Sequence, residues 1–128
     1  MIVEQIKDCI QEVYDELGPG HRETVYQEAL CHEFRIRAIP FFTEHSVEVL
    51  YKQQKVGLHF LDFLVIADND DTVIIELKAT NNIDTPMIRG QLISYMRTLS
   101  VDYGILVNFH YTKEPIIIIE ENNEQETV

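Results

Sequence analysis

The chain has 128 residues, enough for one domain with a buried core, and its 45% apolar and 25% charged residues are typical of a soluble globular protein. Its formal net charge of −12 argues against broad, sequence-independent nucleic-acid binding, because phosphate backbones attract basic surfaces. No apolar run approaches the roughly 18 residues of a membrane span, and the acidic N-terminal segment does not have the pattern of a signal peptide. We therefore expect an intracellular, cytoplasmic protein without a membrane partner.

Two helices are predicted in the first third of the chain. Residues 2–17 place apolar side chains at three- and four-residue spacing, which is typical of an amphipathic helix. Gly18 and Pro19 end this helix and reset the direction of the chain. A second helix is expected over residues 21–38.

The second helix has an acid on its apolar face. On a helical wheel Glu23 falls on the same side as Tyr26, Leu30 and Phe34. An acid in that position needs a partner, and a metal ion or a basic group in the core would supply one. Alternatively, Glu23 is a carboxylate near the helix N-terminus that the helix dipole favours. The sequence leaves both interpretations open.

Three strands are predicted in the middle of the chain. Residues 45–51 alternate apolar and polar side chains, and a polar turn separates them from an apolar strand over 56–67. A third strand is expected over 72–79, after a tip of Asp and Asn residues at 68–70 that suits a three-residue hairpin loop. The prediction is a three-stranded antiparallel meander.

The second hairpin of this meander carries polar residues at positions where apolar ones would be expected. If Ala67 faces Asp71 across the tip, the register pairs Asp62 with Glu76, and Lys78 joins their face by the two-residue period. Two carboxylates and an ammonium on one face of an apolar hairpin are costly unless the acids bind something. The hairpin is therefore a candidate metal site.

A third helix is predicted after the hairpin. Thr85 as N-cap and Pro86 at the first helical position would start a helix that runs to about Leu99. Tyr95 belongs to its apolar face, and Gln91 lies at the border of that face, one turn earlier. Gln91 is either a solvated edge residue or a side chain that points into the site.

Two more strands complete the predicted fold. Residues 103–109 form a nearly continuous apolar run, as expected for a central strand, and 115–119 form an edge strand. The acidic segment 120–128 is expected to be disordered. The order ααβββαββ predicts a single α/β (α+β) domain over 1–119, in which helices flank a mixed β-sheet.

Two sequence patterns carry a family resemblance. Asp62 followed by Glu76-Leu77-Lys78 has the pattern of the PD-(D/E)XK nuclease superfamily, and Gly20 to Tyr26 matches the GxxExxY signature. The chain resembles the GxxExxY protein family, which is assigned to that superfamily, over roughly residues 6–119. This resemblance implies a restriction-endonuclease-like fold.

The resemblance also implies roles for individual residues. Asp62, Glu76 and the Leu77 carbonyl would bind Mg²⁺ or Mn²⁺, hard cations that prefer oxygen ligands. Lys78 would serve the attacking water, so that Asp62, Glu76 and Lys78 form the catalytic set. Glu23 matches a helix glutamate that completes or adjoins the metal site.

Three further residues would support the site. Gln91 and Tyr95 resemble a QxxxY element that supports the active site or contacts DNA in related nucleases, and Tyr26 of the signature is grouped with them. The expected function is a Mg²⁺-dependent nuclease that hydrolyses phosphodiester bonds of DNA, or of RNA, through a metal-activated water. Cutting both strands of a duplex would need two such sites, which a homodimer would provide. The alternative is a catalytically silent, nuclease-like module that binds a protein or nucleic-acid partner.

Overall fold

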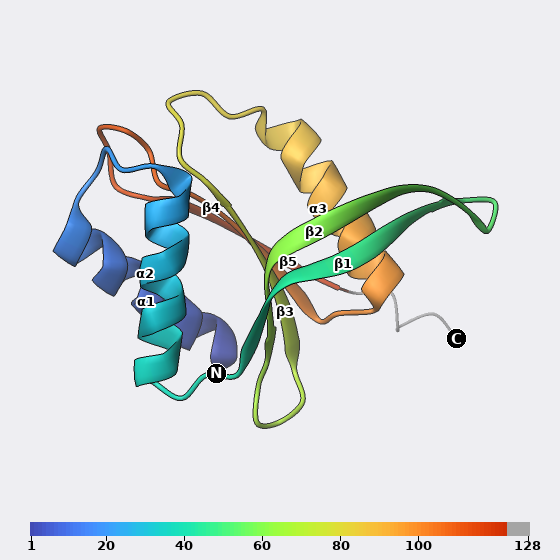
Figure 1. The fold of residues 1–128 in the computed structure, drawn as a ribbon, viewed down its shortest axis with the longest axis horizontal. Coiled ribbons are helices and arrows are strands. Elements are labelled where there is room, and N and C mark those ends of the chain that lie inside the picture. The colour runs from blue at the N-terminus through green and yellow to red at the C-terminus, as the bar shows by residue number, and fades with distance from the viewer. Residues whose placement is uncertain (123–128) are drawn as a thin grey trace.

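The computed structural model describes residues 1–122, in which three helices surround a five-stranded mixed sheet (Figure 1). The predicted order ααβββαββ is confirmed. The sheet order is β1-β2-β3-β4-β5. The elements are α1 (Ile2–Leu17), α2 (Glu23–Ile36), β1 (Phe41–Tyr51), β2 (Gln54–Ile66), β3 (Thr72–Lys78), α3 (Thr85–Leu99), β4 (Tyr103–Asn108) and β5 (Ile116–Glu121).

The sheet combines the predicted meander with one parallel pair. Strands β1, β2 and β3 pair in sequence and antiparallel, which confirms the meander. Helix α3 then connects β3 to β4, which runs parallel to it, and β5 closes the far edge antiparallel to β4. Strand β4 is therefore an inner strand, as its apolar run predicted.

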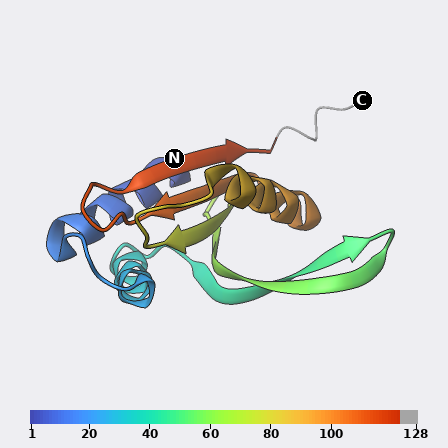
Figure 2. The ribbon, with the colours of Figure 1, turned by 90° about the horizontal axis from the view of Figure 1, so that it is seen from above.

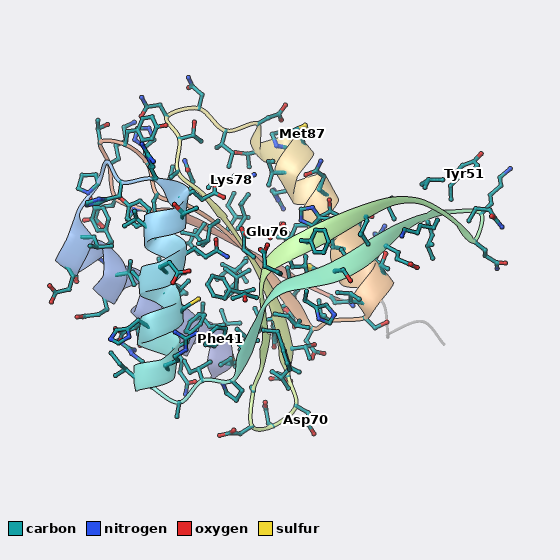
Figure 3. The ribbon with its side chains drawn as sticks, in the orientation of Figure 1. Phe41, Tyr51, Asp70, Glu76, Lys78 and Met87 are labelled. Atoms are coloured by element: carbon teal, nitrogen blue, oxygen red, sulfur yellow. The ribbon has the colours of Figure 1, made fainter. Side chains whose placement is uncertain are left out.

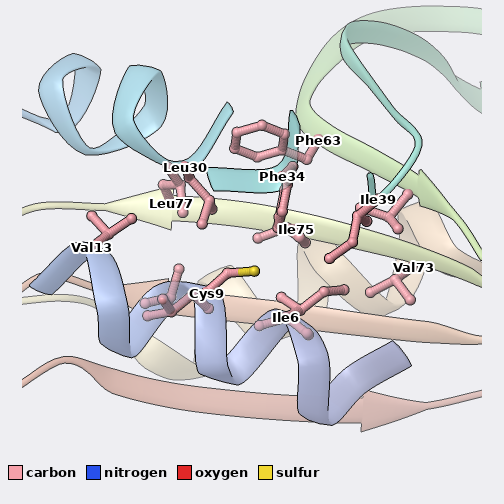
Figure 4. Packing of buried hydrophobic residues seen from close by; sticks show 14 of the residues in the cluster. Ile6, Cys9, Val13, Leu30, Phe34, Ile39, Phe63, Val73, Ile75 and Leu77 are labelled. Carbon is pink, nitrogen blue, oxygen red and sulfur yellow. The ribbon is translucent and has the colours of Figure 1, made fainter. Parts of the chain in front are cut away.

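Each face of the sheet has its own apolar cluster. Helices α1 and α2 cover one face, and Val73, Ile75 and Leu77 of β3 point into that cluster (Figure 4). Helix α3 covers the other face, where Ile74 packs with buried residues of the helix. Full burial of an aliphatic or aromatic side chain contributes about 1.5–3 kcal/mol, so these two clusters supply the main stabilisation of the fold.

The register of the β2–β3 hairpin follows the prediction. The Ala67 N–H donates to the Asp71 carbonyl oxygen at 2.8 Å, and the Cα pairs run from Ile66 with Thr72 to Phe63 with Ile75. Past Phe63 the two strands part. Strand β2 continues with β1 as a two-stranded arm that leaves the body of the sheet (Figures 1 and 2).

The start of α3 differs from the prediction. The N-cap is Asp84, whose Oδ1 accepts a hydrogen bond from the Met87 N–H at 3.1 Å, so Thr85 is the first helical residue. An N-cap carboxylate reaches the amide three residues ahead, and both Asp84 and Thr85 are residue types that can do so. The sequence pattern therefore placed the cap one residue too late.

Other element boundaries also differ from the prediction. Helix α2 spans Glu23–Ile36, narrower than the predicted 21–38. Strand β1 begins at Phe41, earlier than predicted. Strand β5 extends to Glu121, because its pairing with β4 continues to Tyr103, so the first two acids of the predicted tail belong to the sheet. Residues 123–128, on which the rest of that prediction falls, lie outside the described part.

Within residues 1–122 no helix has the length and apolar character needed to cross a membrane.

Candidate active site

The predicted hairpin residues meet at the fork where β2 and β3 part. The Leu77 N–H donates to Asp62 Oδ2 at 2.8 Å, and the Asp62 N–H donates to Glu76 Oε2 at 2.9 Å. Each carboxylate thus binds the backbone of the opposite strand, beyond the last backbone pair of Phe63 with Ile75. A buried N–H without an acceptor costs about 1–3 kcal/mol. The two carboxylates therefore accept hydrogen bonds from the backbone N–H groups at the fork. These bonds fix the positions of the carboxylates.

The Leu77 carbonyl faces the same fork. The N–H and C=O of one residue in an antiparallel pair point to the same neighbouring strand. Because the Leu77 N–H binds Asp62 of β2, its carbonyl also lies on the β2 side. The next carbonyl, of Lys78, points the other way and accepts from the Phe109 N–H at 2.8 Å.

The three acids of the site all have raised pKa values. Burial is the main reason that the pKa of Glu76 is raised, and the nearby Asp62 charge adds to it. Burial likewise raises the pKa of Asp62, while the Leu77 N–H and Lys78 oppose the shift. Glu23 has a raised pKa through burial and repulsion by Asp62. Without a metal, ionisation of all three carboxyl groups is therefore unfavourable. A bound cation would favour the ionised carboxylates.

Lys78 and Glu23 belong to the same charge cluster. Lys78 attracts the carboxylates of both Glu23 and Asp62 and so partly offsets the rise in their pKa values. Figure 3 shows Glu76 and Lys78 on β3, with Lys78 toward the start of α2, where Glu23 is the first residue. The wheel placed Glu23 on the apolar face, and the structure shows it half-buried beside the fully buried Tyr26.

Asn108 fixes the chain segment that follows Lys78. Its Oδ1 accepts from the Thr80 N–H at 3.1 Å, and its Nδ2 donates to the Thr80 carbonyl at 3.0 Å. This buried side chain of β4 holds the exit of β3 by two bonds. Asn108 is not among the predicted site residues, because a polar residue at the end of an apolar strand could equally face solvent.

The donor set suits a hard divalent cation. Among residues 1–122 no group of three His, Cys, Asp or Glu side chains is arranged to hold a metal. Mg²⁺ does not require such a group, since it is usually bound through one or two carboxylates together with waters and substrate phosphates. Asp62 Oδ1 accepts no hydrogen bond within the described chain, and the Leu77 carbonyl faces the same space. These groups fit Mg²⁺ or Mn²⁺.

His59 also enters the site. Its Nε2 lies 2.6 Å from Glu76 Oε1, and its ring stacks on Tyr95 of α3 at a centroid distance of 4.4 Å. By the two-residue period of a strand, positions 59 and 62 should face opposite sides. The bend of β2 at the fork brings both near Glu76, which a regular strand pattern could not indicate.

The other predicted supporting residues lie in different surroundings. Tyr26 is fully buried, donates from its hydroxyl to the Gly18 carbonyl at 2.7 Å, and stacks on Phe109 at 4.0 Å. Its contacts therefore support the packing of α2 against the sheet. Gln91 is exposed on α3, and its side chain makes no hydrogen bond within residues 1–122.

A cavity of about 410 Å³ opens beside Glu23. It lies between the start of α2, the end of β3 and the segment before β5, and is lined by Gly20, His21, Arg22, Glu23, Ala79 and Tyr111. Arg22 is exposed and forms no ion pair in the described chain. Tyr111 is 46% exposed. The cavity thus places the Arg22 guanidinium and the accessible Tyr111 ring next to Glu23.

Comparison with known proteins identifies the family. A model of the PD-(D/E)XK nuclease superfamily matches residues 1–118, which include every predicted site residue. The chain belongs to the PD-(D/E)XK nuclease superfamily. The mixed sheet flanked by helices is consistent with a restriction-endonuclease-like fold.

The PD-(D/E)XK chain is similar to the solved structure titled "Crystal structure of SSO0001", with 17% sequence identity and a TM-score of 0.49. The match covers 80% of this chain and 52% of that one, so the chain spans about half the length of the structure it matches. No curated protein matches the chain.

Proposed function

We propose that the chain is a divalent-metal-dependent nuclease that hydrolyses phosphodiester bonds of nucleic acid, DNA in the first place. The observation that carries this proposal is the fork, where Asp62 and Glu76 are fixed on opposing backbones. We also place the chain in the GxxExxY group of the superfamily, because Gly20, Glu23 and Tyr26 have the signature spacing.

Each residue of the fork has a part in this chemistry. Asp62, Glu76 and the Leu77 carbonyl would hold Mg²⁺ or Mn²⁺, and Glu23 would adjoin that site. When bound, the cation would supply positive charge at the phosphate and lower the pKa of a coordinated water. Lys78 shares the charge cluster with Glu23 and Asp62 and would orient the water and stabilise the developing charge.

We propose that the substrate approaches through the cavity beside Glu23. A guanidinium binds phosphate oxygens in a two-pronged geometry, and Arg22 has no carboxylate partner in residues 1–122 that would compete. Tyr111 could stack on a base, a contact that tolerates any sequence. A local contact of this kind is compatible with the net charge of −12. Arg22→Ala should raise KM several-fold in a steady-state cleavage assay and change kcat little.

The experiment is a cleavage screen over single-stranded, duplex and branched DNA and over RNA, with Mg²⁺ or Mn²⁺. We expect the parent to cut and Asp62→Ala and Glu76→Ala to lose cleavage. Lys78→Ala should lower kcat by about 100-fold or more, the usual contribution of a proton-transfer or charge-stabilising group. The matched control is Asp68→Ala, which removes an exposed acid at the tip of the same hairpin. Cleavage that persists in Asp62→Ala and Glu76→Ala would overturn the proposal.

One observation favours the second candidate, a catalytically silent module. Both oxygens of Glu76 already have hydrogen-bond partners, His59 Nε2 and the Asp62 N–H. A site that only stabilises the fold would show the same contacts. The two candidates differ in a thermal unfolding scan with Mn²⁺, because a cation that binds the folded state raises Tm. A rise in Tm that Asp62→Ala abolishes supports the nuclease, and no rise in the parent supports the module.

A further inference from the structure

We propose that His59 is the positioning residue of the site, holding the Glu76 carboxylate in the orientation that binds the cation. The inference rests on the proposed metal-dependent function and adds a residue that neither the family pattern nor the sequence singled out. His59 lies on β2, three positions before Asp62, in the part of the strand that turns into the arm.

The Glu76 carboxylate is attached at two points. Oε1 binds His59 Nε2 at 2.6 Å, and Oε2 accepts from the Asp62 N–H at 2.9 Å. A carboxylate offers about four lone-pair positions, so each oxygen keeps capacity for a cation after these bonds. Without His59, Oε1 has no partner within residues 1–122, and the side chain is held at Oε2 alone.

His59 is itself held in place. Its ring stacks nearly parallel to Tyr95, with 4.4 Å between centroids and 10° between planes. The backbone position opposite His59 is Val47, which is buried against the α3 face of the sheet. Tyr95 of α3 therefore holds the ring, and the pairing of β2 with β1 holds the backbone of His59. Tyr95, one of the predicted supporting residues, would thus act by holding the His59 ring in place.

His59 is more exposed than the carboxylate that it contacts. The side chain of Glu76 is 11% exposed and that of His59 is 34% exposed. His59 therefore lies at the rim of the fork and shields Glu76 from one side. Groups that hydrogen-bond to metal ligands orient them, and their removal typically costs about 10- to 100-fold in metal affinity or activity. His59 has the geometry of such a group, donating through Nε2.

The test measures Mn²⁺ binding to the full, metal-free chain by calorimetric titration, without substrate. We expect His59→Ala to weaken Mn²⁺ binding about 10- to 100-fold. His59→Gln should recover most of the affinity, because a glutamine amide can donate from nearly the position of Nε2. Tyr95→Ala should weaken binding in the same direction and by less. The matched control is His32→Ala, an exposed histidine of α2, which should bind like the parent.

The outcomes separate this inference from the proposed function. If Asp62→Ala loses Mn²⁺ binding while His59→Ala keeps the parent affinity, the role of His59 is refuted and the metal site stands. If the parent and Asp62→Ala both fail to bind Mn²⁺, the proposed function and the role of His59 are refuted together. If His59→Ala and His59→Gln are equally weak, the loss comes from packing and the donor role is refuted. Thermal unfolding of each variant confirms that the compared proteins are folded.

Discussion

The β2–β3 hairpin is held together differently at its two ends. At the closed end, backbone pairs run from Ile66 with Thr72 to Phe63 with Ile75, and the flanking side chains are apolar. At the open end, the backbone N–H groups of Asp62 and Leu77 donate to the side-chain carboxylates of Glu76 and Asp62, and not to backbone carbonyls of the opposing strand. The closed end stabilises the fold through burial, whereas the open end holds acids with raised pKa values. The difference separates an apolar end that stabilises the fold from a polar end at which burial disfavours ionisation of the acids.

The largest expected effect is at the closed end. Phe63 is fully buried, and its ring contacts those of Phe34 and Phe41 at centroid distances of 5.4 and 5.8 Å. Phe63→Ala removes this packing and leaves a cavity, so we expect the free energy of unfolding to fall by about 3–5 kcal/mol. Urea unfolding of the metal-free parent and variant measures this difference in the free energy of unfolding.

A matched control lies on the same strand. Phe60 is 52% exposed on the arm, beyond the fork. Phe60→Ala should change the free energy of unfolding by no more than about 0.5 kcal/mol, as surface substitutions usually do. Equal losses for Phe60→Ala and Phe63→Ala would show that the arm is as important to stability as the closed end, and the contrast between the two ends would fail.

A smaller effect is expected at the tip. Asp70 has φ of 71°, a left-handed conformation that an aspartate tolerates better than an alanine. Asp70→Ala should lower the free energy of unfolding by about 1 kcal/mol, and Asp70→Gly should be at least as stable as the parent. Both variants should cut nucleic acid like the parent, because the tip is at the opposite end of the hairpin from the fork. Loss of cleavage in Asp70→Gly would contradict this separation.

Regular features of the fold could be predicted from the sequence because they are periodic. Alternation predicted the meander, and the tip residues predicted the register that the structure shows from Ile66 with Thr72 to Phe63 with Ile75. The apolar run after α3 predicted an inner strand. These features depend on neighbours along the chain, and the same patterns brought the hairpin acids and Lys78 to attention.

Features that depend on irregular geometry could not be predicted. His59 reaches Glu76 only because β2 leaves the sheet at the fork, which a two-residue period does not describe. The cap of α3 depended on the choice between two adjacent capping residues, and the structure uses Asp84. The carboxylate contacts with the backbone at the fork depend on how far the strands part, which no local pattern encodes.

The smallest expected effect is a pH-dependent gain in stability at the open end. Burial raises the pKa of Asp62 above its unfolded value of about 3.9. Below the unfolded pKa both states are protonated, and as pH rises through the folded pKa the native state loses stability, because it must ionise a buried acid. Asp62→Asn removes this loss and can keep an acceptor for the Leu77 N–H. The metal-free variant should therefore melt above the parent at pH 7, and the two should converge near pH 3. A difference in Tm that is the same at both pH values would place its origin in packing, and the acids of the fork would then carry no electrostatic cost in the absence of a cation.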